Sequence, residues 1–330
     1  MKFKIKTEEL KKVVSTVSRI VDPRPAAPAL QGIYFRTTEG FVEVIGSDLD
    51  IVIKAKTKAE VEIEGKALIN ARVLSEMVRK LPRGEVTFSD IGSELRVEQN
   101  KLNFTLRKLD EETYPEALLN KNYDEEKTQT IEPNELFESL KKVGIAASPE
   151  GGRPILTGVY FNNEDEKTEI AATDSYRLTT HDLTNFPIKD AGILSFRSLN
   201  ETAKIFEQTE EKIQLNSTER ELYFYDDQFT VSIRKLEGTF PEYGKLFPKE
   251  NLFSVEINKK DILEALDRAT VVAEGFIPVK MEILDTETLR ITTINKDIGG
   301  GNEEVSIKIL GLDVGDTTGF TMSFNPNYLI

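Results

Sequence analysis

Apolar residues recur at helical spacing in several segments of the chain. Leu10, Val13, Val14, Val17 and Val21 fall at positions i, i+3, i+4, i+7 and i+11, which places them on one face of an amphipathic helix over residues 7–21. The same analysis predicts four more helices, over residues 71–83, 133–148, 196–206 and 258–270, and the start of another at residues 325–330.

Boundary signals support the first of these helices. Thr7 is the expected N-cap residue, with Glu8 and Glu9 in the first turn, and Pro23 and Pro25 follow the last apolar position. We therefore expect the helix to begin at Thr7.

Between the helices the pattern changes to the alternation that is typical of strands. Residues 2–6 alternate strictly, and residues 30–63 form short alternating runs separated by turn residues such as Glu39-Gly40 and Ser47-Asp48. Further strands are predicted over residues 67–70, 85–89, 94–99 and 102–106. The order strand, helix, strands occurs twice in each copy of a sequence repeat, which the next paragraph describes. We therefore predict an α+β fold in which each copy has two helices packed on a mostly antiparallel sheet.

The chain repeats itself at a separation of 126 positions. Residues 28–35 (PALQGIYF) match residues 154–161 (PILTGVYF). Two further matches keep that separation: Ser47-Asp48 with Thr173-Asp174, and Tyr114-Pro115-Glu116 with Phe240-Pro241-Glu242. A weaker third copy begins near Phe253. We therefore expect three domains, over residues 1–126, 127–252 and 253–330, and we expect the second half of the third domain to be missing from this sequence.

Composition excludes several classes of site. The 330 residues include no cysteine and one histidine, so disulfides, thiolate zinc sites, cysteine nucleophiles and multi-histidine metal sites are excluded. No segment approaches the roughly 20 apolar residues of a membrane span, and the N-terminus alternates instead of forming a signal peptide. With 30% charged and 39% apolar residues, we expect a globular cytoplasmic protein.

Charge is unevenly distributed along the chain. The formal net charge is −14, but the five predicted helices sum to +5, which leaves −19 on the remainder. Helices on one side of a sheet would make that side basic, and Arg24 and Arg153 add cations at equivalent places in two Pro-rich loops. Few aromatic residues accompany these cations, which favours phosphate contacts without base readout. The alternative is that these charges are simply solvated.

No set of residues suggests a reaction. Asp48 and Asp50 are more typical of a hairpin turn than of a metal site, because no third ligand lies nearby in the sequence. Residues 299–301 (GGG) precede Asn and Glu rather than the Lys and Ser/Thr of a phosphate-binding loop, so we expect a hairpin tip. His181 has no neighbouring nucleophile, and we expect a structural or surface role.

Several motifs together resemble the bacterial sliding clamps, the beta subunit family of DNA polymerase III. They are the N-terminal MKF, the segment Arg24-Pro25…Pro28-x-Leu30-x-Gly32, and residues 172–178 (ATDSYRL), 238–243 (GTFPEY) and 324–328 (FNPNY). The resemblance implies a non-catalytic processivity factor without cofactor or metal. It implies a head-to-tail homodimer that closes a ring of six similar domains, with helices lining a hole around duplex DNA. An enzyme on a repeated α+β scaffold and a structural oligomer without a DNA partner are the alternatives.

The resemblance also assigns sites. Candidate DNA contacts are Arg24, Arg72, Arg153, Arg197, Lys12, Lys142, Lys204 and Arg268. A pocket for short peptides of the replicative polymerase, the clamp loader and repair polymerases maps onto Leu156, Thr173, Tyr176, Arg177, Leu178, Pro241, Lys245, Leu246, Phe276, Asn325 and Tyr328. The ring interface maps onto Met77, Leu81, Arg96, Phe104, Leu106 and Arg107, facing Val271, Val272, Glu303 and Glu304. Ser175-Tyr176 and Lys245 depart from the family pattern, which affects the peptide preference. For Leu156, Leu178 and Leu246, a role in the core is the alternative.

Overall fold

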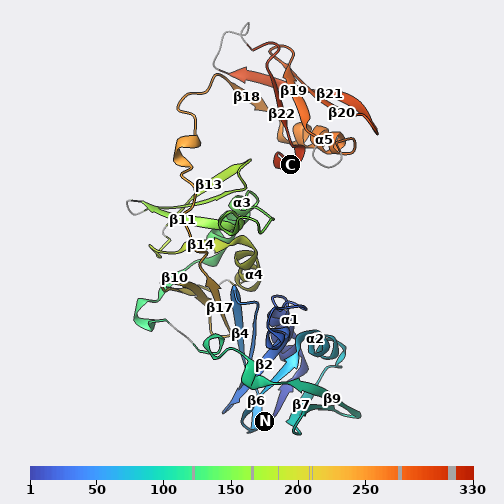
Figure 1. Ribbon diagram of the computed structural model, residues 1–330, viewed down its shortest axis with the longest axis vertical. Helices are drawn as coiled ribbons and strands as arrows, with labels where there is room; N and C mark the ends of the chain where they lie inside the picture. The colour runs from blue at the N-terminus through green and yellow to red at the C-terminus, as the bar shows by residue number, and fades with distance from the viewer. Residues whose placement is uncertain are drawn as a thin grey trace. The chain divides into compact units, whose positions relative to one another are not determined.

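The computed structural model divides into two compact units, Met1–Pro241 and Glu242–Ile330, each of which is described by itself (Figure 1). Its helices in chain order are α1 (Thr7–Ser18), α2 (Ala71–Lys80), α3 (Pro133–Gly144), α4 (Phe196–Phe206) and α5 (Lys259–Thr270). The structure describes residues 1–120, 123–164, 167–184, 186–207, 209, 211–273, 277–310 and 317–330.

The described residues of the first unit form two antiparallel sheets. The larger has thirteen strands in the order β10-β15-β16-β17-β4-β3-β2-β6-β9-β8-β7-β1-β5, and the smaller has the order β13-β12-β11-β14. In the first repeat the strands are β1 (Lys2–Lys6), β2 (Gly32–Thr38), β3 (Phe41–Ser47), β4 (Ile51–Lys58), β5 (Glu60–Ile63), β6 (Gly65–Asn70), β7 (Glu85–Asp90), β8 (Glu94–Gln99) and β9 (Leu102–Leu109). In the second they are β10 (Gln129–Ile131), β11 (Gly158–Glu164), β12 (Lys167–Thr173), β13 (Leu178–Leu183), β14 (Gly192–Ser195), β15 (Ile213–Ser217), β16 (Glu221–Tyr225) and β17 (Phe229–Arg234).

The predicted fold class and helices are confirmed, with differences at the ends. The first, second and third helices end three or four residues early. Directly after α2, Leu81 adopts an extended conformation, as expected for a residue before Pro82. The N-cap prediction for Thr7 was wrong: Lys6 holds that position, while Thr7 is buried and its Oγ1 accepts a hydrogen bond from Gln99 Nε2 at 3.2 Å.

One sheet crosses the boundary between the first two repeats. Strand β17 of the second repeat pairs with β4 of the first, with Val231 opposite Ile53 and Ile233 opposite Ile51. All four residues belong to one hydrophobic core that also contains residues of α1, α2, α3 and α4. Because side chains alternate between the faces of a sheet, α1 of the first repeat and α4 of the second pack on the same face of this sheet, whereas α3 packs on the smaller sheet. The division at residue 126 stays a prediction, since strands from both sides of it share this sheet.

A smaller apolar cluster lies on the opposite face of the first repeat. Tyr34, Ile45 and Val52 point to this side, whereas their neighbours along the strands belong to the helix-facing core. Tyr114 packs here against Tyr34, with ring centroids 5.3 Å apart. Leu118 and Leu119, which follow Tyr114 along the chain, pack against the same cluster. The segment after the first repeat therefore covers this face.

The second unit has a five-stranded antiparallel sheet in the order β18-β21-β20-β19-β22, on which α5 packs. Ala265 and Leu266 of α5 share a core with Val279, Ile291 and Val305. The predicted helix start near residue 325 is a 3₁₀ turn over Pro326–Tyr328. The strands of the sheet in the second unit are β18 (Ser254–Ile257), β19 (Val279–Ile283), β20 (Thr288–Asn295), β21 (Gly299–Leu310) and β22 (Thr321–Phe324). Among the described residues, no helix combines the length and the apolar character that a membrane crossing requires.

Candidate functional site

The helices of the described residues are slightly basic. With their observed bounds they carry twelve Lys and Arg residues against nine Asp and Glu residues. This excess is smaller than the predicted +5, because Arg19 and Arg83 lie beyond the ends of α1 and α2. The remainder of the chain is strongly acidic, so the bias predicted from the sequence is present but weaker.

A groove between α1 and α2 collects cations from both helices. It has a volume of about 780 Å³, and its walls include Lys12, Arg72 and Arg79. Arg72 is largely exposed, and its nearest carboxylate oxygen, in Glu76, is 3.9 Å away. Such an exposed pair contributes about 0–1 kcal/mol and leaves the guanidinium accessible. Lys11 also lines the groove, but its Nζ donates to the carbonyl of Leu81 at 2.7 Å.

The loop cations are exposed as expected. Arg24 lies in the loop after α1, where its backbone N–H donates to Asp22 Oδ1 at 2.8 Å. Arg153 lies at the equivalent place in the second repeat, and its Nη1 donates to Ser175 Oγ at 3.4 Å. Lys142, in the last turn of α3, is exposed as well. The guanidinium groups of these loops and the Lys142 ammonium can therefore reach an anion from solvent.

Other predicted DNA contacts have partners within the chain. Lys12 Nζ donates to Gln228 Oε1 at 2.5 Å and lies 5.5 Å from the centre of the Phe229 ring. Arg197 pairs with Asp48 and Lys204 with Glu201, as detailed below. Gln228 and Phe229 belong to the second repeat, whereas Lys12 belongs to the first. These contacts therefore lie at the junction of the two repeats.

Arg268 and Glu303, which were assigned to different sites, contact each other. The Arg268 guanidinium donates to both Glu303 oxygens, at 2.9 and 2.6 Å. The Glu303 carboxylate holds the pKa of Arg268 above its ordinary value, and the pKa of Glu303 is lowered in return. A predicted DNA contact and a predicted interface residue thus satisfy each other in the single chain.

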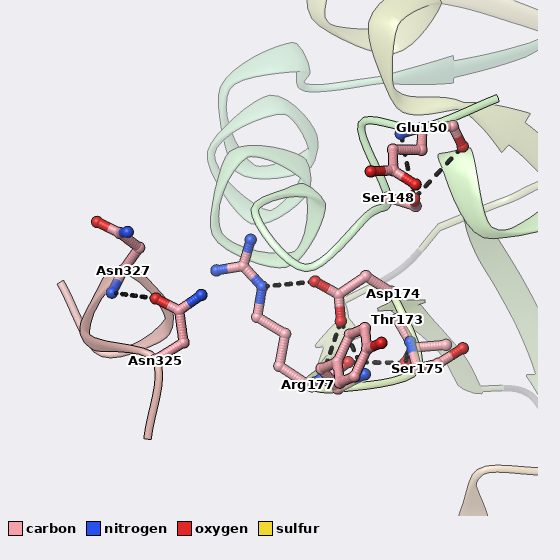
Figure 2. A network of polar contacts seen from close by, with 9 residues as sticks. Ser148, Glu150, Thr173, Asp174, Ser175, Arg177, Asn325 and Asn327 are labelled. Carbon is pink, nitrogen blue, oxygen red and sulfur yellow. Dashed lines mark hydrogen bonds and ion pairs between the residues drawn. The ribbon is translucent and has the colours of Figure 1, made fainter. Parts of the chain in front are cut away.

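A tight turn in the second repeat carries the best-formed part of the predicted peptide pocket. Asp174 Oδ1 accepts hydrogen bonds from the amides of Tyr176 and Arg177 at 2.9 and 3.0 Å, and its Oδ2 lies 3.1 Å from Arg177 Nε (Figure 2). Thr173 Oγ1 accepts from the Ser175 amide and donates to the Arg177 carbonyl. Ser175 has a φ of +78°, and the turn leaves Tyr176 81% exposed.

The neighbours of this turn separate into core and surface. Leu156 is buried, in agreement with the alternative that it is a core residue. Leu178 is half-buried at the start of β13, and Pro241 is exposed. The Phe240 ring stacks on Tyr160 with centroids 5.1 Å apart. In the first unit, a partner can therefore reach four members of the predicted set, namely Tyr176, Arg177, Leu178 and Pro241.

The second unit contributes the remaining predicted pocket residues. Leu246 is 69% exposed, so it is not a core residue, and the adjacent Lys245 pairs with Glu242 at 2.5 Å. Asn325 Oδ1 accepts from the amide of Asn327 at 3.0 Å and so caps the 3₁₀ turn that contains Tyr328 (Figure 2). Phe276 lies outside the described residues.

Several predicted interface residues lie on strands whose edges are partly unpaired among the described residues, whereas Met77 and Leu81 lie in or directly after α2. In the first unit, β9 pairs along its length with β8, but among the described residues it meets β6 only through Lys108 and Leu109. Phe104 and Arg107 are exposed on this strand. Arg96 of β8, which lies opposite Thr105, is half-buried, and so is Met77 in α2. Leu81 and Leu106 belong to the helix-facing core, so their side chains are buried in the single chain.

The matching strand in the second unit is β21. Its residues 299–306 pair with β20, and only residues 307–310 pair with β18. Glu304 on this strand pairs with Arg290 at 2.8 Å. Val271, which directly follows α5, is largely exposed, and Val272 is half-buried. Apolar and acidic residues thus accompany a strand edge that is unpaired over residues 299–306 within the described part of the chain.

The residues that the sequence analysis excluded from chemistry have structural roles. Asp48 is a turn carboxylate, as predicted: its Oδ1 accepts from the amides of Asp50 and Ile51 at 3.1 and 3.0 Å. Gly299 pairs with Asn295 next to the tip of the β20–β21 hairpin. His181 is exposed in β13. Within the part of the chain that the structure describes, no group of His, Cys, Asp and Glu residues could hold a metal ion.

Three profiles of one protein family match consecutive parts of the chain. They describe the N-terminal, central and C-terminal domains of the DNA polymerase III beta subunit, and they match residues 1–119, 130–242 and 244–330. The matches follow the order of the three repeats that the sequence analysis identified.

Individual relatives agree with this assignment. The beta sliding clamp of Streptomyces coelicolor is 29% identical over 339 residues, a match that covers 100% of this chain and 87% of the relative. That of Halalkalibacterium halodurans is 30% identical over 329 residues, covering 93% of this chain and 84% of the relative. The crystal structure of the DNA polymerase sliding clamp from Bacillus subtilis superposes with a TM-score of 0.88 at 28% identity and covers 100% of this chain and 88% of that one. The chain therefore belongs to the DNA polymerase III beta subunit family, the sliding clamps that serve DNA replication as non-catalytic processivity factors.

Proposed function

We propose that the exposed cations on the helix side of this clamp contact the phosphates of the duplex DNA it encircles. The observation that carries this assignment is the shared core: α1 of the first repeat and α4 of the second contribute to one core and pack on the same face of the sheet that β4 and β17 join. Among the candidate contacts, Arg72, Arg24, Arg153 and Lys142 are exposed and have no close carboxylate partner among the described ion pairs. They act without base readout, because phosphates carry no sequence information.

A small excess of positive charge suits this role. Each phosphate that a protein neutralises steepens the salt dependence of binding by about 0.9 in log–log slope, so many strong contacts would hold the DNA firmly at low salt. A closed ring stays on DNA by topology. Weak attraction that does not depend on sequence is therefore sufficient, and it leaves the ring free to slide.

The two strand edges that lack a partner over part of their length among the described residues supply the proposed ring interface. Strand β9 of one protomer would pair with β21 of its partner, which satisfies backbone groups that an edge strand exposes. Phe104 and Met77 supply apolar area, while Arg96 and Arg107 face Glu303 and Glu304 of the partner subunit. Opposite charges at the rim of such a contact favour one register and one head-to-tail orientation.

The exposed turn around Tyr176 is the proposed docking surface for short peptides of the replicative polymerase, the clamp loader and repair polymerases. Tyr176 and Leu178 offer an aromatic and an aliphatic contact, and Thr173, Asp174 and Arg177 hold the turn rigid through the hydrogen bonds given above. Little conformational entropy is then lost when a peptide binds. These partners act in the cytoplasm, which is where we propose that the clamp works.

A loading experiment tests the central assignment. The protein is loaded onto nicked circular plasmid with its clamp loader and is separated from free protein by gel filtration. We expect it to remain on the circle and to leave after a single restriction cut opens the plasmid. Equal retention on the circular and the linear form would contradict a topological link.

A further inference from the structure

Two poorly exposed carboxylates lie beneath the cations at the junction of the first two repeats. Asp48 Oδ2 lies 3.1 Å from Arg197 Nη1, and the Asp48 side chain is 9% exposed. Glu201 Oε2 accepts from Arg19 Nε at 3.1 Å, and its Oε1 lies 2.5 Å from Lys204 Nζ, with 16% of the side chain exposed. Two of these three pairs join one repeat to the other.

The carboxylates are fixed in place more firmly than the cations. Asp48 Oδ1 accepts two backbone hydrogen bonds within its own turn, so its orientation does not depend on Arg197. Glu201 lies within α4. The side chains of Arg197 and Lys204 are 67% and 45% exposed. Phosphates of DNA can therefore approach the cations, while the carboxylates beneath them stay where they are.

We propose that Asp48 and Glu201 are positioning residues that hold Arg197, Arg19 and Lys204 toward the DNA and cancel part of their charge. This inference rests on the proposed function, since it assumes that the helix side faces DNA. A cation with a nearby fixed carboxylate still contacts a phosphate, but it contributes less net attraction than a free one. The pairs therefore orient the cations and limit how tightly the ring holds the duplex.

Among the described residues, the candidate contact Arg72 in the α1–α2 groove lacks such a partner, whereas Arg268 of the second unit is paired with Glu303. The Arg72 guanidinium and the nearest Glu76 oxygen are 3.9 Å apart on an exposed helix surface, where water screens the pair. The Arg197 and Arg19 pairs are shorter, and both carboxylates are largely shielded from water by the surrounding chain. The carboxylates thus reduce the net attraction of Arg197, Arg19 and Lys204 for phosphates. Arg72 in the α1–α2 groove keeps its attraction.

Neutral isosteres test the proposal. Glu201→Gln and Asp48→Asn keep the size of each side chain and a carbonyl acceptor, but they remove the negative charge. Binding of the full chain to a short fluorescent duplex is measured by anisotropy over a range of salt concentrations. For each variant we expect affinity to rise roughly threefold at about 50 mM salt and the salt slope to steepen by about one.

Glu43→Gln is the matched control. Glu43 also pairs with an arginine, Arg36, at 2.5 Å and is only partly exposed. By strand alternation both residues lie on the sheet face opposite the helices, because Phe35 and Val44 point into the helix-facing core. Its removal changes the net charge by the same amount away from the proposed DNA surface, so DNA affinity should stay unchanged.

The outcomes separate three cases. A lower melting temperature of Glu201→Gln and Asp48→Asn with unchanged DNA affinity shows a structural role only and overturns the proposal. An equal rise in affinity for Glu43→Gln also overturns it, because net charge alone would then explain the effect. Arg72→Ala tests the proposed function separately: if wild type does not bind the duplex or Arg72→Ala binds equally well, the DNA surface itself is misassigned.

Discussion

Two turns at equivalent places in the first and second repeats have the same internal structure. Leu49 and Ser175 both have positive φ, +80° and +78°. In each turn an aspartate Oδ1 accepts from two backbone amides, and the preceding hydroxyl residue accepts from the amide two positions later. The preceding hydroxyl also donates to a carbonyl four positions later.

The surroundings of the two turns differ completely. Asp48 pairs with Arg197 of the other repeat, and the strand that follows, β4, is covered along its edge by β17. Asp174 pairs with Arg177 of its own turn, and β13 pairs only with β12 among the described residues. Local chemistry therefore builds the turn, and its neighbours decide whether it becomes a junction between repeats or an exposed docking surface.

The largest effect is expected at the seam between β4 and β17. Ile233 is fully buried there, opposite Ile51. Ile233→Ala should lower the free energy of unfolding by about 2–5 kcal/mol, because it leaves a cavity between the repeats. Urea denaturation measures this loss. Thr179→Ala on the open strand β13 should change stability by less than about 0.5 kcal/mol, and equal losses at the two sites would contradict the comparison.

Substitutions in or next to the exposed turn around Tyr176 should change the affinity for a peptide rather than the free energy of unfolding. Leu178→Asp places a carboxylate beside the apolar anchors of a bound peptide, which costs affinity unless the charge is paired. We expect at least a roughly tenfold loss of affinity for a leucine-containing partner peptide, measured by calorimetry. Leu49→Asp in the equivalent turn of the first repeat is the control. Full affinity in Leu178→Asp with an intact fold would refute the docking surface.

Substitutions at the two residues with positive φ should have equal, modest effects. Asparagine adopts this backbone conformation more readily than leucine or serine, so Leu49→Asn and Ser175→Asn should each stabilise the chain by about 0.5 kcal/mol. Leu49→Val should destabilise it, because a β-branched side chain fits that conformation poorly. Thermal unfolding gives the ranking. Opposite signs for the two asparagine variants would show that the turns are not locally equivalent.

The smallest expected effect is the change with pH in the contribution of Asp48 to the stability of the folded chain. Burial raises the pKa of Asp48 above its ordinary value, although the amides of Ile51 and Asp50 and the Arg197 guanidinium act in the opposite direction. The folded chain then binds this proton more tightly than the unfolded chain. The resulting contribution to stability is present below the ordinary pKa of about 3.9 and is lost as the pH rises through the raised value.

Asp48→Asn isolates this contribution. The stability of wild type relative to the variant should fall over that interval of pH and then level off, which urea denaturation at a series of pH values can follow. A relative stability that increases with pH would show that the ion pair, rather than burial, controls this carboxyl group.

Local signals in the sequence were sufficient for most elements. Apolar spacing identified the helices, and alternation between turn residues identified strands such as β1 and β8 with their observed bounds. Helix ends were less accurate, because they depend on contacts outside the helix. Thr7 looks like an N-cap from its neighbours, but Gln99, 92 positions away, makes it a buried helical residue.

Contacts between distant segments could not be predicted from the repeat. Nothing in the matched motifs indicates that β17 pairs with β4 or that Arg197 meets Asp48, because the equivalent Asp174 pairs locally. The candidate site shows the same limit. The family resemblance assigned Arg268 and Glu303 to different surfaces, whereas the structure makes them a pair. Counting charges along the sequence indicates a basic side, but only the three-dimensional structure shows which cations already pair with carboxylates of the same chain.

The shared sheet bears on how the repeats depend on each other. A duplicated domain that folded alone could later be cut free or shuffled into another protein. Here the first repeat without β17 would expose β4 as an edge strand beside uncovered apolar residues such as Ile51 and Ile53, a combination that favours aggregation. We therefore expect the first two repeats to be stable together, as residues 1–241, and not as separately transferable domains.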